Sequence, residues 1–206
     1  MKKQFHREIT TRALGSYFAA ETLESVIVAN LGQDALRYQF GHDHFHYDSN
    51  SFVAGNAYCD KLRLAIAAAL QKGQIGDARA DLGRLSHTVQ DLYAHSNYVA
   101  LWRQLYPDAV PDDIDPEFAI VLQDARFHSG KLYYPLEVFS FIDSIKPYVL
   151  PLLPRDSHAW MNLDDPGRPD FSHAFAAAVK RTRLEYLRIV KKLSSGAVSG
   201  LTGLTG

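Results

Sequence analysis

Three residues that can bind metal recur at every fourth position of one segment: His87, Asp91 and His95. The surrounding sequence, LGRLSHTVQDLYAHSNY, is typical of an α-helix, in which residues four apart lie on one face. Neighbouring Cβ atoms on such a face are about 5–6 Å apart. Imidazole nitrogen and carboxylate oxygen are zinc ligands, so the spacing indicates a metal site. A polar helix face with an internal ion pair is the alternative interpretation of this motif alone.

A second group of potential ligands lies in the segment from Gly41 to Asn50. Five of them occupy seven positions: His42, Asp43, His44, His46 and Asp48. Clustered imidazoles are typical of metal binding or proton transfer. The segment has no helical period and predicts a loop, and in an extended loop alternate side chains such as His44 and His46 point the same way. We expect His46 to be the main ligand, and Asp48 to orient an imidazole or to cap the helix that begins near Phe52.

The elements that must position these residues are all predicted to be helices. Apolar residues at helical spacing, with glycines and prolines between the segments, predict helices at about 5–18, 22–30, 53–72, 77–102, 116–124, 136–149 and 171–193. Prolines between 107 and 116 predict an exposed excursion. We expect an all-α, single-domain bundle over 1–193 and a flexible Gly/Ser/Thr-rich tail over 194–206.

Composition narrows the function classes. The 206 residues include 22 basic and 23 acidic side chains, so no overall field attracts polyanions. Cys59 is the only cysteine, which excludes an internal disulfide and a cysteine-based zinc site. The first residues lack the apolar stretch of a signal peptide, and no segment is long and apolar enough to span a membrane. We therefore expect a cytoplasmic protein without a stable nucleic-acid complex.

Four separated segments resemble the superfamily of zinc-dependent phospholipase C and S1/P1 nuclease, most closely its heterokaryon-incompatibility C branch. They are HREITTRAL, then ANLGQD followed by HFHYDSNSF, then GRLSHTVQDLYAHSNY, and finally SHAWMNLDDP with the helix containing AFAAAVKRT. The resemblance covers about residues 6–182. It implies an all-helical bundle that holds two or three zinc ions and hydrolyses phosphoric esters.

Residue by residue, the resemblance implies a metal-ligand set. It contains His6, Asp34, His46, His87, Asp91, His95 and His158. His44 from the loop and Asp164 near the late histidine complete the candidates, and His128 competes with His158. The family has a carboxylate four residues after its late histidine, where this chain has Asn162, and a tryptophan at its mature terminus, where this chain has Met1.

The function that these residues imply is a zinc-dependent, phospholipase C-like phosphoric ester hydrolase. Asp34 or Asp43 is the predicted general base that accepts the proton of the attacking water. The substrate is a phospholipid or a nucleotide, with transient contact to a membrane surface. The alternatives are a single-strand nuclease-like phosphodiesterase and a non-catalytic helical protein stabilised by metal. A ferritin-like di-iron protein is disfavoured because the chain lacks Glu-x-x-His, and an HD-type phosphohydrolase because His42-Asp43 lies in a loop.

Overall fold

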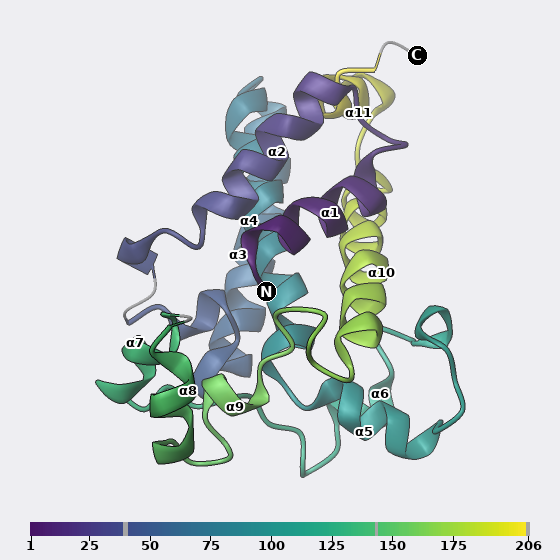
Figure 1. The fold of residues 1–206 in the computed structure, drawn as a ribbon. Helices are drawn as coiled ribbons and strands as arrows, with labels where there is room; N and C mark the ends of the chain where they lie inside the picture. Colours follow the sequence, from purple (N-terminus) through teal and green to yellow (C-terminus); the bar gives the residue numbers. More distant parts are fainter. Residues whose placement is uncertain (39–40, 143, 205–206) are drawn as a thin grey trace.

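The helix α4 (Ile75–His95) is the central element of the computed structural model, which describes residues 1–38, 41–142 and 144–204. Three other long helices pack around it (Figure 1): α2 (Ala20–Gly32), α3 (Phe52–Gln71) and α10 (Phe171–Val190). Within the described ranges the extended pairings are two isolated bridges and there is no strand. The predicted all-α fold is confirmed.

The first helix, α1 (Lys3–Leu14), packs against α2 and α10. Ile9, Ala13 and Leu14 on its inner face are fully buried in the main core. His6 and Thr10 lie on the same buried face and are also inaccessible to solvent. The helix therefore carries one potential ligand directly into the interior.

Gly83 allows α2 and α4 to approach closely. A Cβ atom at this position would lie 2.4 Å from the carbonyl oxygen of Val26 and 2.8 Å from the backbone nitrogen of Asn30. Only glycine avoids both backbone contacts. The close approach brings the polar end of α2 next to the second half of α4. The ligand stripe, the face of α4 that carries His87, Asp91 and His95, begins there.

The predicted continuous helix over 77–102 is wrong at its carboxyl end, where α4 stops at His95 and α5 (Tyr98–Leu105) begins. Ser96 has an extended backbone, with φ −117° and ψ 169°. Its hydroxyl donates to the carbonyl of Leu92, and its backbone forms a bridge with Ser129. This local hydrogen bonding competes with helical continuation. The break admits a second chain segment beside the ligand stripe.

Short helices cover the carboxyl end of α4. They are α6 (Ala119–Leu122), α7 (Leu136–Ser140), α8 (Lys146–Val149) and α9 (His158–Met161), with 3-10 turns at Leu36–Tyr38, Asp43–Phe45, Asp48–Asn50, Pro111–Asp113 and Leu150–Leu152. The predicted helix over 136–149 is thus two helices, because Pro147 suits the first turn of a new helix and not a helix interior. Residue 143 lies outside the described residues.

The last helix, α11 (Ser195–Thr202), lies where the sequence predicts a flexible tail. The side chain of Ser194 accepts a hydrogen bond from the backbone N–H of Ala197 and caps the helix. Leu201 is fully buried in the main core. The structure thus differs from the predicted tail over Ser195–Thr202: Leu201 anchors a helix there, although glycine and serine dominate its composition. Residues 205 and 206 lie outside the described residues.

The excursion predicted over 107–116 is only partly exposed. Ile114 is fully buried, and Lys180 of α10 donates to its carbonyl oxygen at 3.0 Å. Among the described helices, none combines the length and the apolar character that crossing a membrane requires.

Candidate metal centre

Asp91 is the central carboxylate of the site. Its Oδ1 lies 2.7 Å from the amino group of Met1 and 3.2 Å from Nε2 of His6. Its Oδ2 lies 2.9 Å from Nδ1 of His46 and 2.9 Å from Nε2 of His87. Each carboxylate oxygen is thus shared between groups that come from different parts of the chain.

The 3-10 segment before α3 delivers His46 to this carboxylate. His46 ends the turn Asp43–Phe45, and the next residue, Tyr47, has a left-handed backbone with φ 57°. Ser49 and Asn50 are also left-handed, with φ 53° and 58°. Such conformations cost energy in residues other than glycine and persist where their surroundings fix them. Here they direct His46 inward and keep the buried Asp48 next to His95.

A third group of ligand atoms lies beyond Asp91 along α4. Nδ1 of His95 lies 3.2 Å from Oδ1 of Asp48, and the same oxygen lies 3.9 Å from Nε2 of His158. Nδ1 of His95 is also 3.1 Å from the carbonyl oxygen of His46, which can only accept a hydrogen bond. The ring therefore carries its proton on Nδ1 and turns Nε2 toward Asp164, whose Oδ1 is 3.4 Å away.

Backbone hydrogen bonds hold the segment from 156 to 164 across the carboxyl end of α4. The N–H of His158 donates to the carbonyl of Lys131, and the N–H of Leu163 donates to the carbonyl of Ala94. Ser157 caps the short helix α9, whose first residue is His158. These bonds bring a late histidine and Asp164 to the stripe without a long helix of their own.

The donor set fits metal ions. Three groups of side chains each offer ligand atoms within 4.8 Å of one another: His6, Asp34 and His87; His46, His87 and Asp91; and Asp48, His95 and His158. Several buried ring and carboxylate atoms of these residues have no hydrogen-bond partner within the described structure, among them His6 Nε2, His46 Nε2, His87 Nδ1, His158 Nδ1 and Asp48 Oδ1. An unsatisfied buried polar atom costs about 1–3 kcal/mol, so a cluster of them points to a bound cation.

Electrostatics prepare several of these groups for cations. Burial alone raises the pKa of Asp91, but the amino group of Met1 and the nearby imidazoles outweigh it and hold the pKa well below its usual value. Burial lowers the pKa of His87 to about 4, so this imidazole is neutral at neutral pH, the form that binds metal. His95 differs: burial lowers its pKa, yet the charges of Asp91 and Asp48 outweigh it and raise this pKa well above its usual value, so its imidazole holds a proton that a metal ion must displace.

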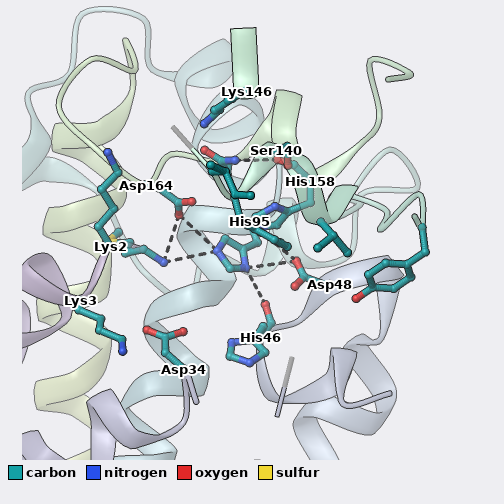
Figure 2. Close-up of a pocket in the computed structure, with 16 residues that line it drawn as sticks. Lys2, Lys3, Asp34, His46, Asp48, His95, Ser140, Lys146, His158 and Asp164 are labelled. Atoms are coloured by element: carbon teal, nitrogen blue, oxygen red, sulfur yellow. Dashed lines mark hydrogen bonds and ion pairs between the residues drawn. The ribbon is translucent and has the colours of Figure 1, made fainter. Parts of the chain in front are cut away.

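A cavity of about 600 Å³ opens onto the cluster from the side of α7 and α8. Figure 2 shows Asp34, His46 and His95 directed toward the same space. Val138, Phe141 and Ile142 form apolar parts of the wall, and lysines 2, 3 and 146 are also in its lining. The cavity is therefore lined by aspartates and histidines of the cluster and, around its rim, by apolar side chains and lysines.

The structure brings together most of the residues that the sequence singles out. His6, Asp34, His46, His87, Asp91, His95, His158 and Asp164 all lie in or beside the cluster. His44 and Asp43 are not among the grouped ligands of the described residues. The expectation that His44 and His46 point together is wrong because the segment is a 3-10 turn, with three residues per turn, and not an extended loop. The ring of His44 instead packs on Phe45, with ring centroids 4.4 Å apart.

The competing late histidine, His128, lies apart from these groups. Its backbone N–H donates to the side-chain oxygen of Asn97 at 2.9 Å, and its Nδ1 lies 2.7 Å from the carbonyl oxygen of Arg126. Of the two histidines, His158 is therefore the one at the cluster.

Two site residues lie outside the predicted ligand set. Asp48 stands beside His95, in agreement with the expectation that it orients an imidazole. Glu137 is fully buried and accepts a hydrogen bond from the N–H of Ala159 at 2.6 Å, next to His158. Nothing in its local sequence, PLEVFS, distinguishes it from a surface glutamate; only the folding of α7 against α9 reveals it.

Together, the fold and the site define an all-α protein with a buried histidine and aspartate centre suited to metal ions. The family described as VWA7 N-terminal domain matches residues 5–115, which is more than half of the chain, and the protein belongs to this family. The matched range includes His6, Asp34, His46, His87, Asp91 and His95 and ends before His158. No curated protein and no solved structure matches the chain significantly.

Proposed function

We propose that the protein is a zinc-dependent phosphoric ester hydrolase of the phospholipase C-like type. One observation carries the proposal: ligand atoms from α1, the loop before α3 and α4 converge around the two oxygens of Asp91, and His158 of α9 joins an adjacent group beside the same cavity. The resemblance of the four sequence segments to the zinc-dependent phospholipase C and S1/P1 nuclease superfamily supports the same chemistry. The three ligand groups, two of which share His87, suit two or three zinc ions.

The residues that would hold the ions are those of the three groups. Bound zinc supplies Lewis acidity toward phosphoryl oxygens and makes water a stronger acid. His87 belongs to both of the first two groups, and Asp91 of the second group also faces His6 of the first through its Oδ1. The imidazoles of His6 and His87 stack with ring centroids 4.2 Å apart, which fixes both rings on one side of the carboxylate.

Asp34 is the proposed general base. Its side chain lines the cavity and is 18% exposed. Oδ1 of Asp34 lies 3.6 Å from Nε2 of His87. Burial raises the pKa of Asp34, but the charges of His87 and His6 outweigh it and hold the pKa below its usual value. The carboxylate is therefore ionised at neutral pH and can accept a proton from water that attacks a phosphoryl group. Asp43, the other predicted base, lies outside the cavity lining.

The cavity wall favours a phospholipid over a nucleotide as substrate. The lining combines apolar side chains of α7 and the segment after it with lysines that would face a phosphate. Large apolar side chains around this rim are exposed, including Phe139 at 45%, Phe141 at 49% and Tyr148 at 79%. Exposed apolar residues beside basic ones suit transient contact with a membrane surface. A net charge of −1 gives no general attraction to nucleic acid.

A structural metal site is the second candidate function. His6 and His87 are fully buried and Asp91 is 1% exposed, and closed coordination is typical of structural zinc. In this case the protein binds metal with high affinity and the metal stabilises the helical bundle without turnover.

One experiment separates the two. The purified chain is analysed for metal by elemental mass spectrometry and assayed with a chromogenic phosphocholine ester and a chromogenic phosphodiester, with and without a chelator. Two or more zinc ions per chain and chelator-sensitive release of the chromophore on the phosphocholine ester support the hydrolase. Preference for the phosphodiester supports the nuclease-like alternative. Bound zinc without turnover supports the structural site, and absence of bound metal overturns both.

Asp34→Asn and Asp60→Asn are the matched variants for this assay. Asp34 faces the cavity, whereas Asp60 is on the outer face of α3 in an ion pair with Arg63. We expect the first substitution to remove turnover and the second to leave it unchanged. Equal activity of both variants would exclude Asp34 as the base.

A further inference from the structure

A buried polar network lies behind His6, on the side away from the cavity. Nδ1 of His6 is 2.7 Å from Oε1 of Gln90, the residue before Asp91. The amide nitrogen of Gln90 donates to the hydroxyl oxygens of Thr10 on α1 and Thr182 on α10, both at 3.1 Å. Gln90, Thr10 and Thr182 are all fully buried. No solvent is needed to satisfy the amide, because each of its ends has a protein partner.

Thr182 decides which way the amide of Gln90 points. The hydroxyl of Thr182 donates its proton to the carbonyl oxygen of Ala178 at 2.8 Å, one turn earlier on α10. With that proton committed, the hydroxyl oxygen can only accept from Gln90, so the nitrogen of the amide must face it. With the amide reversed, two oxygen atoms would face each other without a proton between them.

The same orientation is supported from α2. The amide nitrogen of Asn30 donates to Oε1 of Gln90 at 3.2 Å and to the hydroxyl oxygen of Thr10 at 3.3 Å. Oε1 of Gln90 therefore accepts from Asn30 on one side and faces His6 on the other. Since Oε1 has no proton to give, the bond to His6 requires a proton on Nδ1 of the imidazole.

We infer that Gln90, oriented by Thr182, is a positioning residue that holds His6 in the tautomer with a proton on Nδ1 and a lone pair on Nε2. That Nε2 atom is buried, has no hydrogen-bond partner in the described structure, and lies 3.2 Å from Oδ1 of Asp91. His6 is grouped with Asp34 and His87 as a possible metal ligand. The network thus prepares His6 as a ligand before any ion arrives.

The role of this tautomer in metal binding rests on the proposed function, whereas the tautomer itself does not. Metal-binding histidines commonly donate their second ring N–H to a carboxylate or carbonyl, and loss of that partner costs about 10–100-fold in metal affinity. Here the acceptor is a side-chain amide, and its direction is set by a hydroxyl on another helix. α10 therefore contributes to the centre although none of its side chains is among the grouped ligands.

The first test measures the tautomer in the metal-free protein. Histidine labelled with ¹⁵N and ¹³C gives ring chemical shifts that distinguish Nδ1–H from Nε2–H, recorded near pH 8. We expect the Nδ1–H form for His6 in the wild type and in Thr182→Ser, which keeps the hydroxyl. Gln90→Met and Thr182→Val, which have similar shapes without the hydrogen bonds, should shift His6 toward the Nε2–H form, because Oδ1 of Asp91 lies 3.2 Å from Nε2 and can accept that proton. An Nε2–H wild type, or an unchanged tautomer in both apolar variants, overturns the inference.

The second test measures zinc affinity by competition with a chromophoric chelator. Gln90→Met and Thr182→Val should bind about 10–100-fold more weakly than the wild type, and Thr182→Ser should restore affinity. Ser86→Ala is the matched control, because Ser86 is a fully buried residue of α4 whose hydroxyl has no partner in the described structure. Equal losses in Ser86→Ala and Gln90→Met would show general destabilisation of α4 and contradict the positioning role.

The two tests can refute the proposed zinc function and the positioning role of Gln90 independently of each other. If the wild type binds no zinc, the proposed function fails, yet the chemical shifts of His6 still decide the tautomer. If zinc binds and the apolar variants keep the wild-type affinity and tautomer, the proposed centre stands and the role of Gln90 does not. Thr182→Val also covers the case in which Gln90→Met fails to fold, since it leaves α4 unchanged.

Discussion

His46 and His87, 41 positions apart in the chain, bring Nδ1 of one ring within 3.1 Å of Nε2 of the other. Both nitrogens also lie 2.9 Å from Oδ2 of Asp91. Three atoms that carry lone pairs thus converge, and a proton or a metal ion must occupy the space between them. Burial lowers the pKa of His46, but the hydrogen bond and charge of Asp91 outweigh it and raise this pKa. The carboxylate that pairs with the protonated ring of His46 in the metal-free protein is suited to bind a cation.

Asp91→Asn tests this centre directly. The substitution keeps the size of the side chain and removes the charge on which the surrounding imidazoles depend. We expect a loss of zinc affinity of about 100-fold or more, because the two oxygens of this carboxylate face His6, His46 and His87, and loss of the stabilisation that bound metal gives to the fold. Equilibrium dialysis and thermal unfolding with and without zinc measure the two effects. Asp60→Asn on the surface is the control, and zinc binding by Asp91→Asn at wild-type strength would remove Asp91 from the centre.

Glu137 supports a second prediction, on stability. Its Oε1 accepts the N–H of Ala159 and lies 3.9 Å from Nδ1 of His158, while burial raises the pKa of its carboxyl group. Glu137→Ala leaves a buried backbone N–H without an acceptor, which costs about 1–3 kcal/mol of unfolding free energy. Glu137→Gln keeps an acceptor and should cost less. Urea denaturation measures both, and an equal effect of the two substitutions would show that the hydrogen bond to Ala159 is not what Glu137 contributes.

Cys59 gives a prediction on pH. Its thiol is 1% exposed, and burial raises its pKa from 9.0 to about 11. The folded protein keeps this proton where the unfolded chain loses it, so the associated stability is fully present below pH 9 and is lost as the pH rises toward 11. At pH 10 the wild type should have lost about 1.4 kcal/mol of unfolding free energy that Cys59→Ala does not lose. This value corresponds to one pKa unit of difference in proton binding between the folded and unfolded states.

Reaction of Cys59 with a disulfide reagent provides a second readout. At pH 8 the native thiol should react far more slowly than the thiol of urea-unfolded protein, because it is both protonated and inaccessible. Fast labelling of the native protein, or equal pH profiles for the wild type and Cys59→Ala, would contradict the burial of this residue between Tyr47 and the core.

The sequence predicts the helices and the ligand face of α4 because both depend on local spacing, whereas His6, Asp34 and His158 are predicted only by the resemblance to the zinc-dependent superfamily. The steps of four from His87 to His95 set the shared face of α4, and the apolar period sets the core of α3 and α10. Local spacing does not predict the break at Ser96, whose backbone forms a bridge with Ser129. It does not predict the 3-10 turn before His46 either, which packs on α3 and α4. Glu137 and Gln90 were not predictable for the same reason, since their partners lie on other helices.

Leu201 tests the part of the fold in which composition is least informative. It is fully buried, and the carbonyls of Gly200 and Leu201 accept hydrogen bonds from Arg79 of α4 at 2.7 and 3.0 Å. Truncation of a buried leucine costs about 2–5 kcal/mol, so Leu201→Ala should lower the unfolding free energy by that amount. Leu204→Ala, at a position 44% exposed, is the control with little expected effect. If both variants unfold at the urea concentration of the wild type, α11 does not pack on the bundle in solution, and the flexible tail predicted from glycine and serine content is the better description.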